Sequence, residues 1–169
     1  MQLTGKLLVA LPILVDANFD RTVIYVVSHD DEAGAVGLVL NRPSATPVAD
    51  ALPQWAEQVA APGVVFVGGP VQTDMAIALA DDGGGVDTID LDGDPALLAA
   101  GHVRVFAGYA GWSPGQVEGE LGEGAWAVVD SDPHDPFADD PEDLWYAVLR
   151  RQRGELRRLA LLPEDVSVN

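Results

Sequence analysis

Short apolar stretches bounded by turn residues are the feature that most constrains the fold of this chain. They are rich in β-branched residues and cover residues 22–28, 35–40, 64–67, 75–80, 103–109 and 125–129. Segments of this length and composition are typical of β-strands. Because they are almost continuously apolar, we expect both faces of the resulting sheet to be covered. The acidic turn at residues 30–34 predicts a hairpin between the first two strands.

The apolar run at residues 7–15 predicts a further buried strand. It is too short to span a bilayer. No small-residue cleavage site follows it, as a secretory signal peptide would require. We therefore expect a cytoplasmic protein without a membrane segment. The length of 169 residues fits one domain, and no linker divides the chain, so a single domain is expected over residues 1–169.

Helices are predicted from their capping residues. Thr46 is expected to cap a helix that restarts at Pro53. Asp140 is expected to cap the last helix, which Gly154 should end. Two acidic segments separate these elements: residues 81–94 predict an exposed loop or hairpin, and residues 130–143 a solvated loop. Strands with a few helices give an α+β fold.

The charge of the chain selects among partner classes. Nine lysines and arginines face 27 acidic residues, which gives a formal net charge of -18 and a pI near 4.1. Such a field repels nucleic acids and anionic membranes, because both are bound through basic side chains. The chain has no cysteine, which excludes disulfides, thiolate metal sites and a cysteine nucleophile.

Residues 111–115 fit the G-x-S-x-G pattern of a serine nucleophile, and Asp132 and His134 could complete a triad. The oxyanion hole of such a site uses the N–H of the residue after the serine, and Pro114 has none. We favour Ser113 as the N-cap of a helix, with Gln116 completing a capping box. A hydrolase that uses Ser113 and His134 remains the alternative.

The other motifs indicate neither a metal nor a cofactor. The three histidines lack metal-ligand spacing, the acidic turn at 90–94 lacks the glycine and glutamate of a calcium loop, and no nucleotide-binding glycine motif is present. Gly68 and Gly69 predict a tight crossing, with a ligand cradle as the alternative. Arg21 and Arg42 flank strands and are expected to pair with carboxylates, with an anion site as the alternative.

Several motifs follow one another in a recognisable order. They are residues 5–10 with Pro12 and Asp16, residues 19–23, residues 34–43, residues 68–71, and residues 108–112 continuing through Gly115 and Gln116 to Glu118, Glu120 and Trp126. Together they resemble the YqgE/AlgH family of bacterial proteins, in its actinobacterial branch. The resemblance implies a bifurcated, mostly antiparallel sheet curled into a pseudo-barrel with a few peripheral helices. It implies no established enzymatic activity, although one branch carries a transcriptional-regulator label.

We therefore expect a non-enzymatic protein that binds a small molecule or a protein partner, with nucleic acid disfavoured and no cofactor. The recognisable residues cluster around turns and form no coherent set of acid, base and nucleophile. If those turns converge in space, the predicted ligand surface consists of Asn41, Arg42, Gly68, Gly69, Tyr109, Trp112 and Gln116. A serine hydrolase and a transcriptional regulator are the two alternatives.

Overall fold

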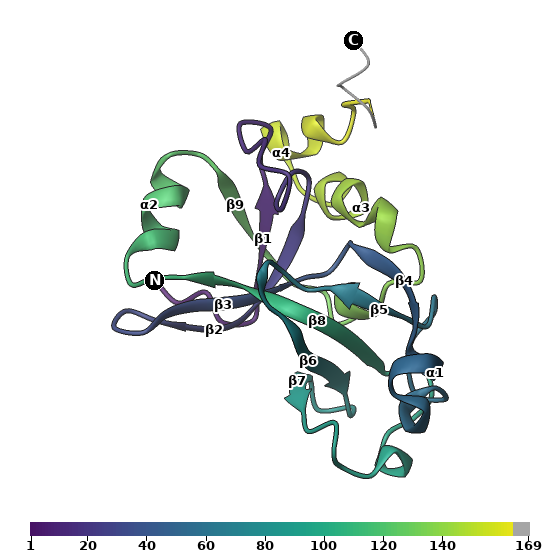
Figure 1. Ribbon diagram of the computed structural model, residues 1–169. Helices are drawn as coiled ribbons and strands as arrows, with labels where there is room; N and C mark the ends of the chain where they lie inside the picture. The colour runs from purple at the N-terminus through teal and green to yellow at the C-terminus, as the bar shows by residue number, and fades with distance from the viewer. Residues whose placement is uncertain (164–169) are drawn as a thin grey trace.

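The computed structural model describes residues 1–163, in which all strands belong to one sheet (Figure 1). The strands are β1 (Lys6–Ala10), β2 (Val23–Asp30), β3 (Gly34–Val39), β4 (Pro43–Pro47), β5 (Val64–Val67), β6 (Val71–Asp81), β7 (Val86–Ile89), β8 (Val103–Trp112) and β9 (Trp126–Asp130). The α-helices are α1 (Val48–Ala51), α2 (Gln116–Gly122), α3 (Leu144–Arg150) and α4 (Gly154–Leu159). Short 3-10 helices are η1 (Pro53–Trp55), η2 (Pro95–Leu97), η3 (Asp135–Phe137) and η4 (Pro141–Asp143).

The sheet divides at β8, which pairs with β3, β5 and β6. The first half of β8 lies between β5 and β6, so that Phe106 pairs with Phe66 in parallel and with Ile77 in the antiparallel sense. The second half pairs with β3, and the order continues through β2 and β1 to β9. The pairing of β5 with β8 is parallel and the other strand pairings of the described chain are antiparallel. The expected α+β fold with a bifurcated sheet is confirmed, and the sheet stays open.

Both faces of the sheet are buried at β1 and the strands beside it, as the apolar strands predicted. On β1, Leu7 and Val9 face the core beneath α3, whereas Leu8 and Ala10 face a second core that contains Trp112 and Val117 of α2. A third core lies between α1, η1 and the strands β6 and β8. Alternate residues of one strand thus enter different cores, because strand side chains point to opposite faces.

Two predicted boundaries near the N-terminal half are wrong. The strand predicted over residues 7–15 ends at Ala10, and Ile13 and Val15 are 69% and 80% exposed, because the chain turns at residues 11–14. Thr46 caps no helix: it lies in β4, which pairs with β5, and α1 begins one residue after Pro47. The β4 pairing is a tertiary contact that overrides the local capping signal.

Two predictions near the C-terminus are also wrong. Gly154 does not end the last helix; with a φ of 62° it turns the chain and begins α4. The segment 130–143 is not solvated throughout, because Asp135 and Phe137 are buried in η3. Arg151 binds the Asp135 carboxylate and so compensates its buried charge. No helix within residues 1–163 combines the length and apolar character that crossing a membrane would require.

Candidate functional site

Arg42 is half-buried beside the segment that joins β1 to β2. Its Nη1 donates to the Ala17 carbonyl at 2.6 Å, and its Nη2 donates to the Asp20 carbonyl at 2.9 Å. No ion pair joins Arg42 to a carboxylate within residues 1–163, so the pairing expected for it is wrong. A guanidinium offers five N–H donors, and these bonds use two of them. Among the residues that the structure describes, carbonyl oxygens alone meet the positive charge of Arg42.

A hollow of about 270 Å³ opens at Arg42. It is lined by Asn18, Val39, Arg42, Val67, Gly69, Pro70 and Thr73. The lining combines one cation, an amide and a hydroxyl with an apolar floor, which is the composition typical of small-ligand sites. Of the residues predicted as a ligand surface, Arg42 and Gly69 meet in this hollow.

The glycine pair lies where three backbone segments cross. A Cβ on Gly69 would come within 2.1 Å of the Tyr109 carbonyl carbon, and one on Gly68 within 2.3 Å of the Gly108 oxygen. Gly108 itself has a φ of 76°, and a Cβ on it would come within 2.5 Å of the Gly69 oxygen. The glycines are thus required for a close approach of β8 to the 68–69 turn. This is the tight crossing that the sequence favoured, and it forms one wall of the hollow.

Four other predicted site residues do not line this hollow. Asn41 accepts from the Val23 N–H and donates to the Arg21 carbonyl, and so holds the left-handed backbone of Arg21. Trp112 donates its indole N–H to Glu120, which Gln116 also contacts through its side-chain amide. Tyr109 packs against the core beneath α3. Ligand binding by these four residues stays a prediction.

Arg42 and Trp112 are nevertheless linked through the same segment. Phe19 stacks on the Trp112 ring with 6.5 Å between centroids and meets the Trp126 ring edge-on at 5.8 Å. Arg42 binds carbonyls on either side of Phe19 in the chain. Motifs far apart in the sequence therefore hold the 16–20 segment from both ends, which fixes one rim of the hollow.

Ser113 does not cap α2. The helix begins at Gln116 after Gly115, which has a φ of 81°. The Ser113 hydroxyl donates to the Gln116 side-chain oxygen at 3.3 Å, and the same oxygen accepts the Ser113 backbone N–H at 3.0 Å. Half of the predicted capping box is present, from the glutamine side. Within the described residues, no hydrogen bond joins Ser113 to His134, which lines a separate hollow with His102.

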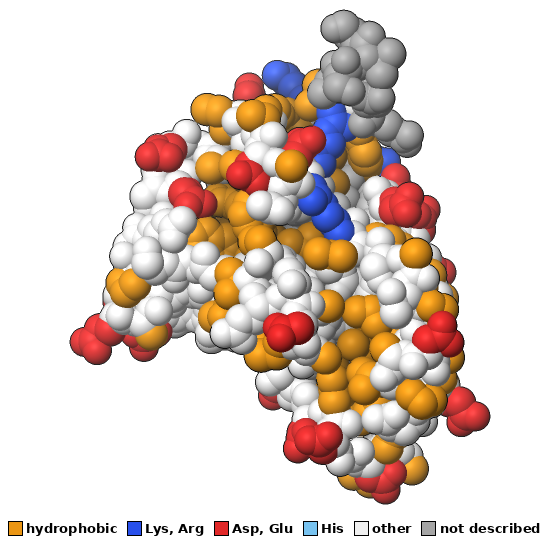
Figure 2. Space-filling model, in the orientation of Figure 1, with side chains coloured by type: hydrophobic (Ala, Val, Ile, Leu, Met, Phe, Trp, Pro, Cys, Tyr) orange, Lys and Arg blue, Asp and Glu red, His pale blue; other side chains and the backbone are white. Residues whose placement is uncertain are grey.

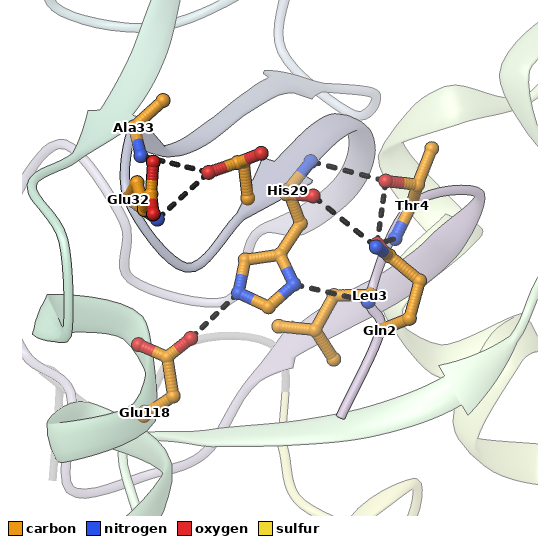
Figure 3. Close-up of polar contacts among 8 residues, drawn as sticks. Gln2, Leu3, Thr4, His29, Glu32, Ala33 and Glu118 are labelled. Atoms are coloured by element: carbon orange, nitrogen blue, oxygen red, sulfur yellow. Dashed lines mark hydrogen bonds and ion pairs between the residues drawn. The ribbon is translucent and has the colours of Figure 1, made fainter.

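His29 forms a polar cluster with Glu118 (Figure 3). Its Nδ1 accepts the Leu3 N–H at 3.3 Å, and its Nε2 lies 2.6 Å from the Glu118 carboxylate. Since Nδ1 is an acceptor, the imidazole proton lies on Nε2, which therefore has no lone pair for a metal ion. Asp31 is near enough to complete a metal-ligand group, yet the geometry favours a structural link that holds the N-terminal segment. The hydrogen bond from His29 lowers the pKa of Glu118.

Arg104 is a buried cation that the sequence analysis did not identify. It is 2% exposed, and its guanidinium donates to the carbonyls of Ala60, Ala61, Pro136 and Ala138. The guanidinium carbon lies 4.3 Å from the centroid of the Phe66 ring. Burial lowers the pKa of Arg104 to about 10, so the side chain is charged at neutral pH. The sequence carries one signal of this burial: Arg104 is the one charged residue in the apolar segment 103–109.

The amino-acid sequence is similar to those of known bacterial proteins. Residues 7–157 match the AlgH-like family DUF179. A UPF0301 protein of Streptomyces avermitilis is 49% identical, covering 99% of this chain and 95% of that protein. A UPF0301 protein of Mycobacterium tuberculosis is 44% identical, with coverages of 98% and 90%. These relatives come from actinobacteria, as the resemblance to that branch implied.

Two solved structures share the fold. A crystal structure of a Corynebacterium diphtheriae protein matches with a TM-score of 0.89 and 28% identity, over 96% of this chain and 93% of that one. The solution structure of the AlgH protein from Pseudomonas aeruginosa matches with a TM-score of 0.71 and 32% identity, over 96% and 95%. The sequence and the structure agree, and the chain belongs to the AlgH-like family.

Proposed function

We propose that this protein is a non-enzymatic binding protein that takes a small carboxylate in the hollow at Arg42. The observation that carries this proposal is the guanidinium of Arg42, which lines the hollow and meets only carbonyl oxygens among the described residues. Its remaining N–H donors match a carboxylate, since the guanidinium fork binds carboxylates through two parallel hydrogen bonds.

The surroundings of Arg42 support the same ligand class. The chain carries a net charge of -18, and no ion pair within residues 1–163 neutralises Arg42, so its guanidinium is a local positive charge on an acidic protein. Val39, Val67 and Pro70 give the hollow an apolar floor, whereas Asn18 and Thr73 offer hydrogen-bonding groups. A ligand with one acidic group and an adjacent apolar part satisfies both kinds of lining.

The experiment is a titration of the protein with butyrate and benzoate at physiological salt, followed by backbone amide NMR. Butyramide, which lacks the charge, serves as the ligand control. We expect shifts confined to the hollow for the acids and none for the amide. Arg42→Gln should weaken binding about tenfold or more, as expected for loss of a charge-assisted hydrogen bond. Arg157→Gln, at an exposed arginine on α4, should leave binding unchanged.

A second variant keeps every hydrogen bond of Arg42. Val67 lines the hollow and is 43% exposed, so Val67→Glu places a negative charge there without disturbing the core. Val128 is a matched control, because it is a strand valine of 37% exposure that lies outside the hollow. Binding lost in Val67→Glu and kept in Val128→Glu supports the proposal. Equal binding by both variants, or by acid and amide, contradicts it.

A cytoplasmic location stays a prediction, as do the roles of hydrolase and transcriptional regulator. The hydrogen bond between Ser113 and Gln116 gives the hydrolase no support.

A further inference from the structure

A second, apolar hollow adjoins the one at Arg42. It has a volume of about 390 Å³ and shares Val67 with the first. Residues of β4, α1, β5, β6 and β8 line it, among them Val65, Val67, Asp74, Met75, Val105 and Ala107. Figure 2 shows hydrophobic side chains gathered between the α1 region and β6 on this face of the molecule.

The apolar hollow exists because one face of the sheet is covered over part of its length. Val65 and Val105 belong to the core beneath α1 and η1. Val67 and Ala107, which pair with each other across β5 and β8, continue the same side-chain rows beyond that cover. Val67 is 43% exposed and Met75 is 37% exposed. The sheet therefore presents an uncovered apolar strip that leads to the Arg42 hollow.

The charged residues at the strip determine which way a ligand with one acidic end binds. Arg42 lies in the hollow at one end, whereas the Asp74 carboxylate belongs to the apolar hollow itself. An acidic group is attracted at Arg42 and repelled near Asp74. Resting on the function proposed above, we infer that the ligand is a free, single-chain aliphatic carboxylic acid. Its carboxylate binds Arg42, and its hydrocarbon chain passes Val67 and lies along the strip toward Met75.

The experiment measures the dissociation constants of straight-chain acids from butyrate to dodecanoate, each below its micelle concentration. Burial of one methylene tightens binding about fourfold, so the constant should fall by that factor for each carbon until the strip is filled. Butyrate that binds as tightly as decanoate overturns this inference and leaves the proposed function standing. If no acid binds at all, both fail.

A pair of variants separates the two hollows. Met75 lines the apolar hollow and is not part of the Arg42 hollow, so Met75→Glu should abolish the dependence on chain length while butyrate binds as in the parent protein. Val128→Glu should change neither measurement. An apolar peptide with a free carboxyl terminus is tested alongside. Tighter binding of that peptide than of dodecanoate, or a Met75→Glu variant that keeps the chain-length dependence, overturns the inference.

Discussion

Replacing Arg104 with methionine removes four hydrogen bonds at once. Methionine keeps much of the apolar stem, so the principal loss is the guanidinium. The carbonyls of Ala60 and Pro136 belong to buried residues, and each loses a charged donor; the Ala60 oxygen keeps the Gly63 N–H, whereas the Pro136 oxygen is left without a partner among the described residues. A buried polar group left without a partner costs about 1–3 kcal/mol. Since Ala61 is exposed, water can replace the arginine there. We expect the free energy of unfolding to fall by about 4 kcal/mol, since hydrogen bonds from a charged donor contribute about 1.5–3 kcal/mol each and two of the lost bonds go to buried residues.

The assay is urea unfolding followed by tryptophan fluorescence, with the melting temperature as a second measurement. For a domain of this size, about 4 kcal/mol corresponds to a melting temperature lowered by about 8–16 °C. Arg157→Met, on the exposed side of α4, should stay within about 0.5 kcal/mol of the parent. If Arg104→Met does not fold, Arg104→Lys provides the intermediate case, because lysine keeps the charge and loses the planar fork. An Arg104→Met protein as stable as Arg157→Met would refute the reasoning.

Four further predictions concern glycine, acid, salt and serine. Gly69→Ala should lower the free energy of unfolding, measured in urea, by about 3 kcal/mol or more, because the added Cβ meets backbone atoms. Gly119→Ala, where a Cβ on α2 would meet open space, should raise that free energy by about 0.4–1 kcal/mol. Equal effects of the two substitutions would contradict the close approach of β8 to the 68–69 turn. The lowered pKa of Glu118 means that its hydrogen bond with His29 stabilises the fold above pH 4.5, and that this stabilisation is lost as the pH falls through the lowered pKa. Glu118→Gln should therefore have a lower melting temperature than the parent protein at pH 7 and the same melting temperature at acid pH. Moderate sodium chloride should raise the melting temperature, since it screens repulsion within a chain of net charge -18; no change would contradict this. A fluorophosphonate probe should not label Ser113, and labelling that Ser113→Ala abolishes would restore the hydrolase.

Much of the sheet could be predicted from local pattern. The six apolar segments each contain a strand, and the acidic turn at residues 30–34 joins β2 to β3. These segments carry their own signal, because β-branched residues between turn residues favour strands independently of distant contacts. β4 was missed because Pro43 and Pro47 discourage strand pairing, and only its neighbour β5 makes it a strand.

The candidate site was predicted in part. Arg42 and Gly69 were identified from motifs, and they meet in one hollow. Asn18, Val67 and Thr73 complete that hollow and have no distinctive sequence signal, because an exposed valine or threonine resembles any other surface residue. Trp112 and Gln116 were grouped with Arg42 on motif order alone. The structure shows that they are joined to Glu120 instead.

The sequence by itself determined most of the strands, the acidic charge and the family, because each of these depends on residues close together in the chain or on residue order. Only the tertiary structure decided which arginine is buried, which is bound to carbonyl oxygens and which glycines touch a second strand. Arg104 and Arg42 have the same side chain, and the carbonyl groups around each come from segments more than 20 residues away. The role of each arginine depends on those carbonyl groups, and the arginine reaches them only when the sheet has formed.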